Sequence, residues 1–262
     1  MCYIFNISPW GSETSAHVWA CPSPHGNEKG DRPPVPRRRK EDGIMKYGES
    51  TFDILYLLFA VIAGFIILRK ARNTTQKLMG AAALILGCGD AFHLVPRVLN
   101  YFAEADFTAA LGIGKLITSI TMTVFYVLLY YIHTGHYQEK KSPSMTGIVW
   151  GLAVIRTALC LFPQNGWMEN RSDMAWGIIR NVPFVLLGAV ICWMYYRSKN
   201  KDIVFRFLWL YICLSFMFYI PVAVAAGVLP MLGMLMLPKT ICYILMILAF
   251  LSSVKAGPES RS

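Results

Sequence analysis

Three ionisable residues with complementary chemistry recur at helical spacing within one apolar stretch. Asp90, His93 and Arg97 occupy positions i, i+3 and i+7 of the run Gly87–Arg97, so they share one face of a helix. An aspartate and a histidine can serve as general acid and base, and an arginine can hold a carboxylate or phosphate through two parallel hydrogen bonds. The spacing predicts a ligand-binding face or a catalytic pair on this helix.

Other apolar stretches also contain polar and basic residues. A charged side chain in the hydrocarbon core costs roughly 2.5–3.5 kcal/mol, so such residues are expected to face the interior of a helix bundle. Asp90 is the single definite anion among them, and the excess of positive charge favours a pocket for a small anionic or zwitterionic ligand or a lipid head group. The predicted ligand-binding residues are Asp90, His93, Arg97, Arg156, Arg180, Asn181, Tyr219 and Lys239.

Two other interpretations fit the same residues. In the first, Asp90 pairs with Arg180 or Lys239 and fixes the register of the helices, which is a purely structural role. In the second, Asp90 and His93 act as acid and base on a lipid head group in an intramembrane enzyme. The sequence favours binding over catalysis, because it supplies many holding groups and one plausible acid and base pair.

The sequence predicts no cofactor and no metal site. His133 and His136 have the i, i+3 spacing of a metal-binding pair, but no third ligand lies near them in the sequence. We therefore expect these two histidines to form a solvated pair at the membrane interface.

The composition predicts a membrane protein. Hydrophobic residues make up 55% of the 262-residue chain and charged residues only 15%, which is too apolar for an ordinary soluble domain. The net charge of +10 comes largely from short basic segments between apolar runs, where it sets membrane orientation. Membrane lipids are therefore the expected partners, and nucleic acid is not.

Seven apolar runs are long enough to cross a hydrocarbon core of about 30 Å as helices. Short connections predict that neighbouring helices pack antiparallel in a single all-α bundle. Lys239 is placed near the middle of the seventh run. The predicted spans are residues 53–69, 77–99, 110–134, 145–163, 174–196, 203–225 and 228–254.

The distribution of lysine and arginine predicts the orientation of the bundle. The first, third and fifth connections and the C-terminal tail are basic, whereas the second, fourth and sixth contain few or no basic residues. Basic loops remain in the cytoplasm, so the first helix is expected to begin outside the cell and the C-terminus to lie in the cytoplasm. The protein is then a multi-pass protein of the cell membrane, and its polar pocket faces outward.

Residues 1–44 do not fit this orientation. They contain the basic cluster Arg37–Lys40, which resists export, directly before a helix that is expected to start outside. We expect Met45 to be the true start, with the seven-helix domain covering residues 45–262. The alternative is a genuine disordered tail that binds anionic lipid through its basic run.

The segment Ala83–Asp90, a run of small and apolar residues that ends in Gly-Asp, resembles part of the lysoplasmalogenase-type membrane hydrolases. This resemblance implies that Asp90 is a catalytic acid or base acting on a lipid substrate. The chain as a whole resembles uncharacterised bacterial seven-helix membrane proteins. This resemblance implies no particular activity for the chain.

Overall fold

The structure is a computed structural model of the chain, and it describes residues 38–102, 105–170, 173–225 and 230–255. Within these residues every regular element is helical, which confirms the all-α prediction. The helices are α1 (Arg38–Lys70), α2 (Thr74–Phe102), α3 (Thr108–His136), α4 (Pro143–Leu161), α5 (Met174–Arg197), α6 (Leu208–Ala225) and α7 (Met236–Lys255), with 3₁₀ segments η1 (Pro163–Asn165) and η2 (Pro230–Leu235).

Six of these helices are long and apolar enough to cross a membrane. The exception is α6, whose apolar part covers Leu208–Val224 and is shorter than the other candidate spans. The predicted sixth span began at residue 203, but residues 203–207 precede α6 as irregular and turn structure. The count of seven spans therefore stays a prediction.

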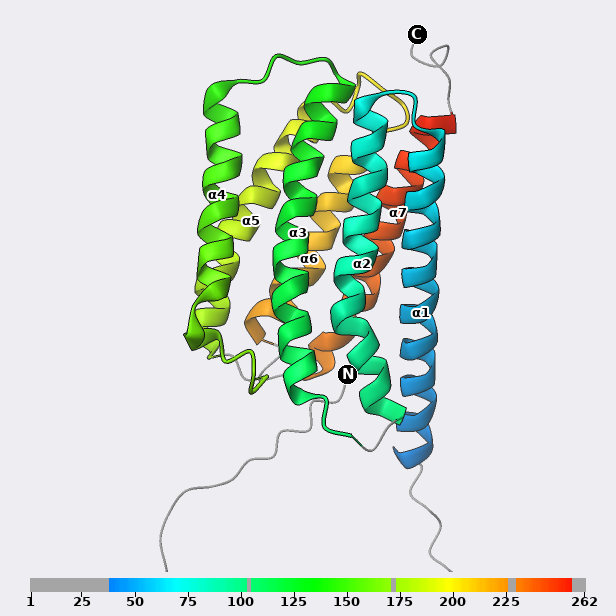
Figure 1. The fold of residues 1–262 in the computed structure, drawn as a ribbon, viewed down its shortest axis with the longest axis vertical. Helices are drawn as coiled ribbons and strands as arrows, with labels where there is room; N and C mark the ends of the chain where they lie inside the picture. Colours follow the sequence, from blue (N-terminus) through cyan, green and yellow to red (C-terminus); the bar gives the residue numbers. More distant parts are fainter. Residues whose placement is uncertain (1–37, 103–104, 171–172, 226–229, 256–262) are drawn as a thin grey trace, which may run out of the picture.

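The helices form a closed bundle. Each of α1 to α6 contacts the next helix along the chain, and α7 contacts α1. Figure 1 shows α1 to α4 side by side in one layer, with α5, α6 and α7 forming a second layer behind them. Contacts of α3 with α5 and of α2 with α7 join the two layers.

The outer surface of the bundle is apolar, as a lipid-facing surface must be. On α1 alone, Leu55, Leu58, Ile62 and Phe65 are between 54% and 61% exposed. A soluble monomer rarely exposes such a continuous apolar surface. The fold is therefore compatible with an integral membrane protein.

Helix α1 extends further toward the N-terminus than the predicted first span. It begins at Arg38 and continues through Met45, so that Asp53 lies inside the helix and not at its start. The prediction that Met45 starts the chain remains a prediction, and residues 1–37 lie outside the described residues.

Glycine allows α2 and α3 to approach closely beside the predicted chemical face of α2. A Cβ atom at Gly114 of α3 would lie 2.8 Å from the Cα of His93 and about as close to the carbonyl carbon of Phe92. Only a residue without a side chain fits there, because backbone atoms cannot move aside cheaply. This contact fixes the position of His93 against α3.

Candidate ligand-binding site

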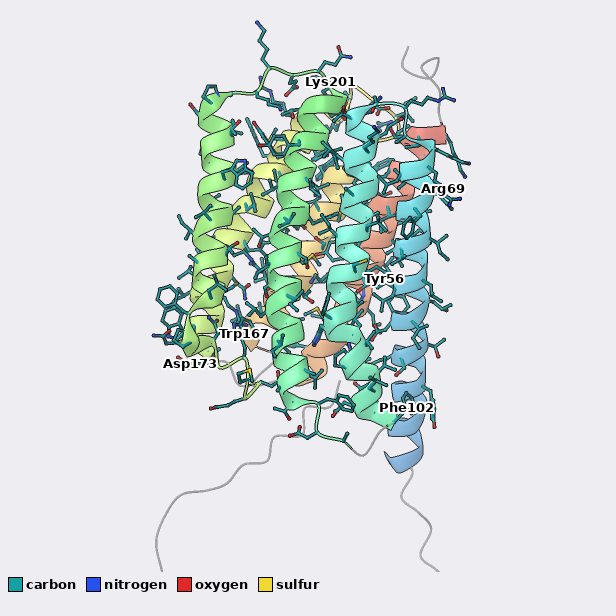
Figure 2. All side chains as sticks on the ribbon, viewed as in Figure 1. Tyr56, Arg69, Phe102, Trp167, Asp173 and Lys201 are labelled. Atoms are coloured by element: carbon teal, nitrogen blue, oxygen red, sulfur yellow. The ribbon has the colours of Figure 1, made fainter. Side chains whose placement is uncertain are left out.

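The bundle has two chemically different ends. The basic end carries the loops that join α1 to α2, α3 to α4 and α5 to α6, including Lys201; the far end carries Trp167 and Asp173 (Figure 2). Tyr56 lies at mid-height between them, at a level far from either set of loops (Figure 2). Its depth marks the level of the candidate site.

Asp90 lies at the depth of Tyr56. The Tyr56 hydroxyl donates a 2.8 Å hydrogen bond to Oδ2 of Asp90, so α1 holds the carboxylate of α2 in place. Asp90 interacts electrostatically with Lys239 of α7, but their charged atoms are more than 4.0 Å apart. Asp90 and Lys239 are each half-buried as whole residues.

Lys239 is placed differently from the prediction. It lies in the first turn of α7, after the 3₁₀ segment η2, and not near the middle of the last helix. Its Nζ lies 4.6 Å from the ring centre of Tyr219 and 5.4 Å from that of Tyr243. These cation–π contacts hold the ammonium group between α6 and α7 without neutralising it.

Arg156 of α4 is the most deeply buried of the predicted basic residues, with 2% of its surface exposed. Its guanidinium carbon lies 3.6 Å from the ring centre of Phe184, and its Nη1 donates a 3.3 Å hydrogen bond to Oδ1 of Asn181. Its Nε is buried and has no hydrogen-bond partner among the described residues. No carboxylate in the described part of the chain forms an ion pair with it.

Asn181 links Arg156 to the rest of the polar cluster. Its Oδ1 also accepts a 2.6 Å hydrogen bond from the Tyr219 hydroxyl, and its Nδ2 donates to the carbonyl oxygen of Gly177. Tyr219 in turn lies under Lys239. Five predicted residues from α2, α4, α5, α6 and α7 are thus connected in one group, which we call the Arg156 cluster: Asp90, Arg156, Asn181, Tyr219 and Lys239.

Arg180 lies beside this cluster with partners of its own. Its Nη1 donates a 2.7 Å hydrogen bond to Oδ1 of Asn165, and its guanidinium carbon lies 4.4 Å from the Trp167 ring centre. Asn165 is held in turn by hydrogen bonds to the carbonyl oxygens that end α4. The turn at the far end therefore fixes Arg180, and no ion pair with Asp90 forms in the structure.

Arg97 belongs to a separate group. Its Nη2 lies 2.7 Å from Oε2 of Glu49 and its Nη1 lies 3.6 Å from Oδ2 of Asp53, both on α1. Its Nε also donates a 3.4 Å hydrogen bond to the Tyr101 hydroxyl. We call Glu49, Asp53, Arg97 and Tyr101 the Arg97 cluster, and it satisfies the charge of Arg97 within the protein.

His93 contacts neither Asp90 nor Arg97 by a hydrogen bond. Its imidazole bonds to the backbone of Leu111 on α3, and its Nδ1 is buried without a partner among the described residues. The predicted acid and base thus bond to different helices, Asp90 to Tyr56 of α1 and His93 to the backbone of α3. The geometry gives no specific support to a joint catalytic role.

The expected solvated pair of histidines at the basic end is wrong, because the side chains of His133 and His136 are only 2% and 7% exposed and have different partners. His136 lies 2.7 Å from Oδ2 of Asp202, whereas Nε2 of His133 lies 3.1 Å from both the Met194 carbonyl oxygen and the Ser198 hydroxyl. Among the described residues, no group of three or more His, Cys, Asp or Glu side chains is arranged to hold a metal ion.

Glu49 and Asp53, which pair with Arg97 of α2, were not among the predicted site residues. The signal was present, because Glu49, Asp53 and Tyr56 recur at i, i+4 and i+7 and so lie on the same face of α1. Placing the helix start at residue 53 put both carboxylates at the membrane surface. Asn165 was also missed, because it lies in a turn whose position no helical period predicts.

Comparisons of the chain with protein families, characterised proteins and solved structures found no match.

Proposed function

We propose that the protein binds or transports a small anionic or zwitterionic ligand, or the head group of a lipid, at the Arg156 cluster. The observation that carries the proposal is Arg156, a cation that is 2% exposed and has no carboxylate partner among the described residues. A buried charge without a counter-ion is costly, so proteins retain one chiefly where it has a function. An anionic group of the ligand would supply the missing countercharge.

The charges of the cluster favour a ligand with one or two negative charges. Arg156 and Lys239 contribute two positive charges against the single carboxylate of Asp90, and Arg180 lies close enough to add electrostatic attraction. A guanidinium holds a carboxylate or phosphate through two hydrogen bonds. Asp90, whose second oxygen has no hydrogen-bond partner among the described residues, would hold the amine of a zwitterion.

The proposal includes the predicted orientation. The bundle would cross the cell membrane seven times with its basic loops in the cytoplasm, so that the far end faces the exterior. Arg156 and Arg180 lie toward that far end, as α4 and α5 are joined there through η1. Access from the exterior suits a transporter or a receptor, and the helix-breaking residues Pro96, Pro183 and Pro221 provide points where α2, α5 and α6 can bend.

The test is a thermal-stability screen of the purified protein with acetate, inorganic phosphate, glycine and ethanolamine, each compared with sodium chloride at equal ionic strength. A ligand that binds only the folded state raises the melting temperature with increasing concentration. We expect acetate, phosphate or glycine to do so and ethanolamine not to.

Two variants assign the effect to the cluster. Arg156→Met removes the proposed anion holder and abolishes the stabilisation, whereas Asp90→Asn reduces only the response to glycine. Arg206→Met is the matched control, because Arg206 is exposed near the basic end. Stabilisation that survives Arg156→Met, or a panel in which no anion exceeds sodium chloride, contradicts the proposal.

A further inference from the structure

A second pocket lies at the basic end, far from the Arg156 cluster. It has a volume of about 210 Å³ and lies between the ends of α3 and α5 and the loop that leads to α4. Its lining includes His133, Glu139, Lys140, Trp193 and Arg197. We call it the Glu139 pocket.

The strongest observation concerns His133, which lines this pocket. His133 is 1% exposed, and its Nδ1 is buried with no hydrogen-bond partner among the described residues. Nε2 lies 3.1 Å from the Met194 carbonyl oxygen, which can only accept, and 3.1 Å from the Ser198 hydroxyl, which can accept or donate. The tautomer with its hydrogen on Nε2 donates to Met194. In that tautomer Nδ1 is an acceptor that requires a donor from elsewhere.

Glu139 supplies a second acceptor beside it. Its Oε1 accepts a 2.8 Å hydrogen bond from Lys201, and its Oε2 lies 3.9 Å from Nδ1 of His133. The hydrogen bond from Lys201 lowers the pKa of Glu139, so this group is a carboxylate at neutral pH. Two acceptors 3.9 Å apart cannot bond to each other, but one nitrogen at about 2.9 Å from each can donate to both.

The remaining charge in the pocket is positive. Lys140 and Arg197 line it, and no carboxylate in the described part of the chain lies within 4.0 Å of either. These two cations suit a phosphate group, whereas Glu139 and His133 suit an ammonium group. The pocket thus offers separate places for the two ends of a zwitterion.

The position of the pocket indicates where such a ligand comes from. The pocket lies where α3 and α5 end, which is the level of the lipid head groups for helices of spanning length. Trp193, which lines it, is 52% exposed, and tryptophan is enriched at the membrane interface. The pocket therefore lies at the level that a lipid head group would occupy.

We propose that the Glu139 pocket binds a phosphoethanolamine head group, with its primary ammonium between Glu139 and His133 and its phosphate at Lys140 and Arg197. The specificity follows from hydrogen bonding. A primary ammonium donates three hydrogen bonds, whereas the trimethylammonium of a phosphocholine head group donates none. A phosphatidic acid carries the phosphate without the amine. The site therefore distinguishes three lipids that share the same tails.

The test measures thermal stabilisation of the detergent-purified full chain by dioleoyl lipids with phosphoethanolamine, phosphocholine or phosphate head groups. Hydrogen bonds to charged groups discriminate by about tenfold or more, so we expect phosphatidylethanolamine to act at about one-tenth of the concentration that phosphatidylcholine requires. Soluble phosphoethanolamine is the fourth probe. Its action at the same concentrations as the lipid would assign the site to the free molecule, with the same recognition chemistry.

Matched variants test each half of the site. Glu139→Gln should make the protein respond equally to phosphatidylethanolamine and phosphatidylcholine, whereas Glu169→Gln, an exposed residue at the far end, should leave the preference intact. Lys140→Met should weaken the stabilisation by each of the three lipids several-fold and to a similar extent. Its neighbour Lys141 does not line the pocket, so Lys141→Met is the control for the loss of one surface charge.

Two outcomes overturn the proposal. One is equal stabilisation of the unchanged protein by the ethanolamine and choline lipids, which would show that Glu139 and His133 do not select a primary ammonium. The other is a preference that survives Glu139→Gln. The Arg156→Met variant should keep the lipid preference, so failure of this proposal and failure of the proposed function are separate results.

Discussion

Arg97 and Arg156 are two buried arginines of one bundle with opposite surroundings. Arg97 lies within 3.6 Å of two carboxylates and beside a tyrosine hydroxyl. Arg156 is buried more deeply, yet its neighbours are an amide and an aromatic ring. The charge of Arg97 is compensated within the protein, while the charge of Arg156 is not compensated among the described residues. The same residue type thus joins two helices through ion pairs in one region and is a candidate ligand-binding residue in the other.

The largest expected effect is that of Arg97→Met. Removing the cation leaves Glu49 and Asp53 buried on the same face of α1 without the guanidinium that pairs with both, which we expect to lower the free energy of unfolding by about 3–5 kcal/mol. Equilibrium unfolding in detergent measures the loss. Adding Glu49→Gln and Asp53→Asn to the variant should recover most of it, because the two carboxylates that Arg97 held are then neutral. An equally unstable triple variant would show that Arg97 contributes by packing and not by charge.

The contacts of Arg97 show which features of the site could be predicted from the sequence and which could not. The helical face of Asp90, His93 and Arg97 was visible from spacing alone, and α2 confirms that the three lie on one helix. Spacing within one helix does not tell which neighbouring helix each side chain meets. Arg97 meets α1, His93 meets α3 and Asp90 meets both α1 and, electrostatically, α7. The partition is set by the order of helices around the bundle.

The remaining differences between sequence and structure arise at the ends of helices. Hydropathy predicts the apolar part of a span, but α1 continues as a helix beyond its apolar part and carries Glu49 and Asp53 inside the bundle. Lys239 moved from the middle of its span to the first turn of α7, because η2 precedes the α-helix. Asn165 and Trp167 come from a turn, which no apolar period describes. Contacts made by helix ends and turns depend on tertiary structure.

Tyr56→Phe tests the contact between α1 and the Arg156 cluster, because Tyr56 holds the Asp90 carboxylate of that cluster. Loss of the 2.8 Å hydrogen bond to Asp90 should lower the free energy of unfolding by about 2 kcal/mol, the value typical of a bond to a charged group. Tyr47→Phe removes the same hydroxyl from an exposed ring of α1 and should change stability little. Equal effects of the two variants would mean that the Asp90 carboxylate is held by other groups.

Tyr219→Phe tests the link between α5 and α6. The hydroxyl donates a 2.6 Å hydrogen bond to Asn181, and its loss should cost about 1 kcal/mol, as for a neutral hydrogen bond. The ring remains under Lys239, so the cation–π contact is kept. Thermal unfolding without any added anion measures the stability. A much larger loss would indicate that Tyr219 has a structural role beyond this single bond.

The smallest expected effect, and the most informative, is that of Arg156→Met on the protein without ligand. Methionine can keep the packing on Phe184, and the variant loses one 3.3 Å hydrogen bond to Asn181 while it removes the cost of burying an uncompensated charge. We expect the free energy of unfolding to stay within about 0.5 kcal/mol of the unchanged protein or to rise. Residues that serve ligands commonly have this property, because their charge is satisfied only when the ligand is bound. A loss comparable to that of Arg97→Met would place both arginines in the same structural role, and the contrast between the two clusters would no longer support a ligand site at Arg156.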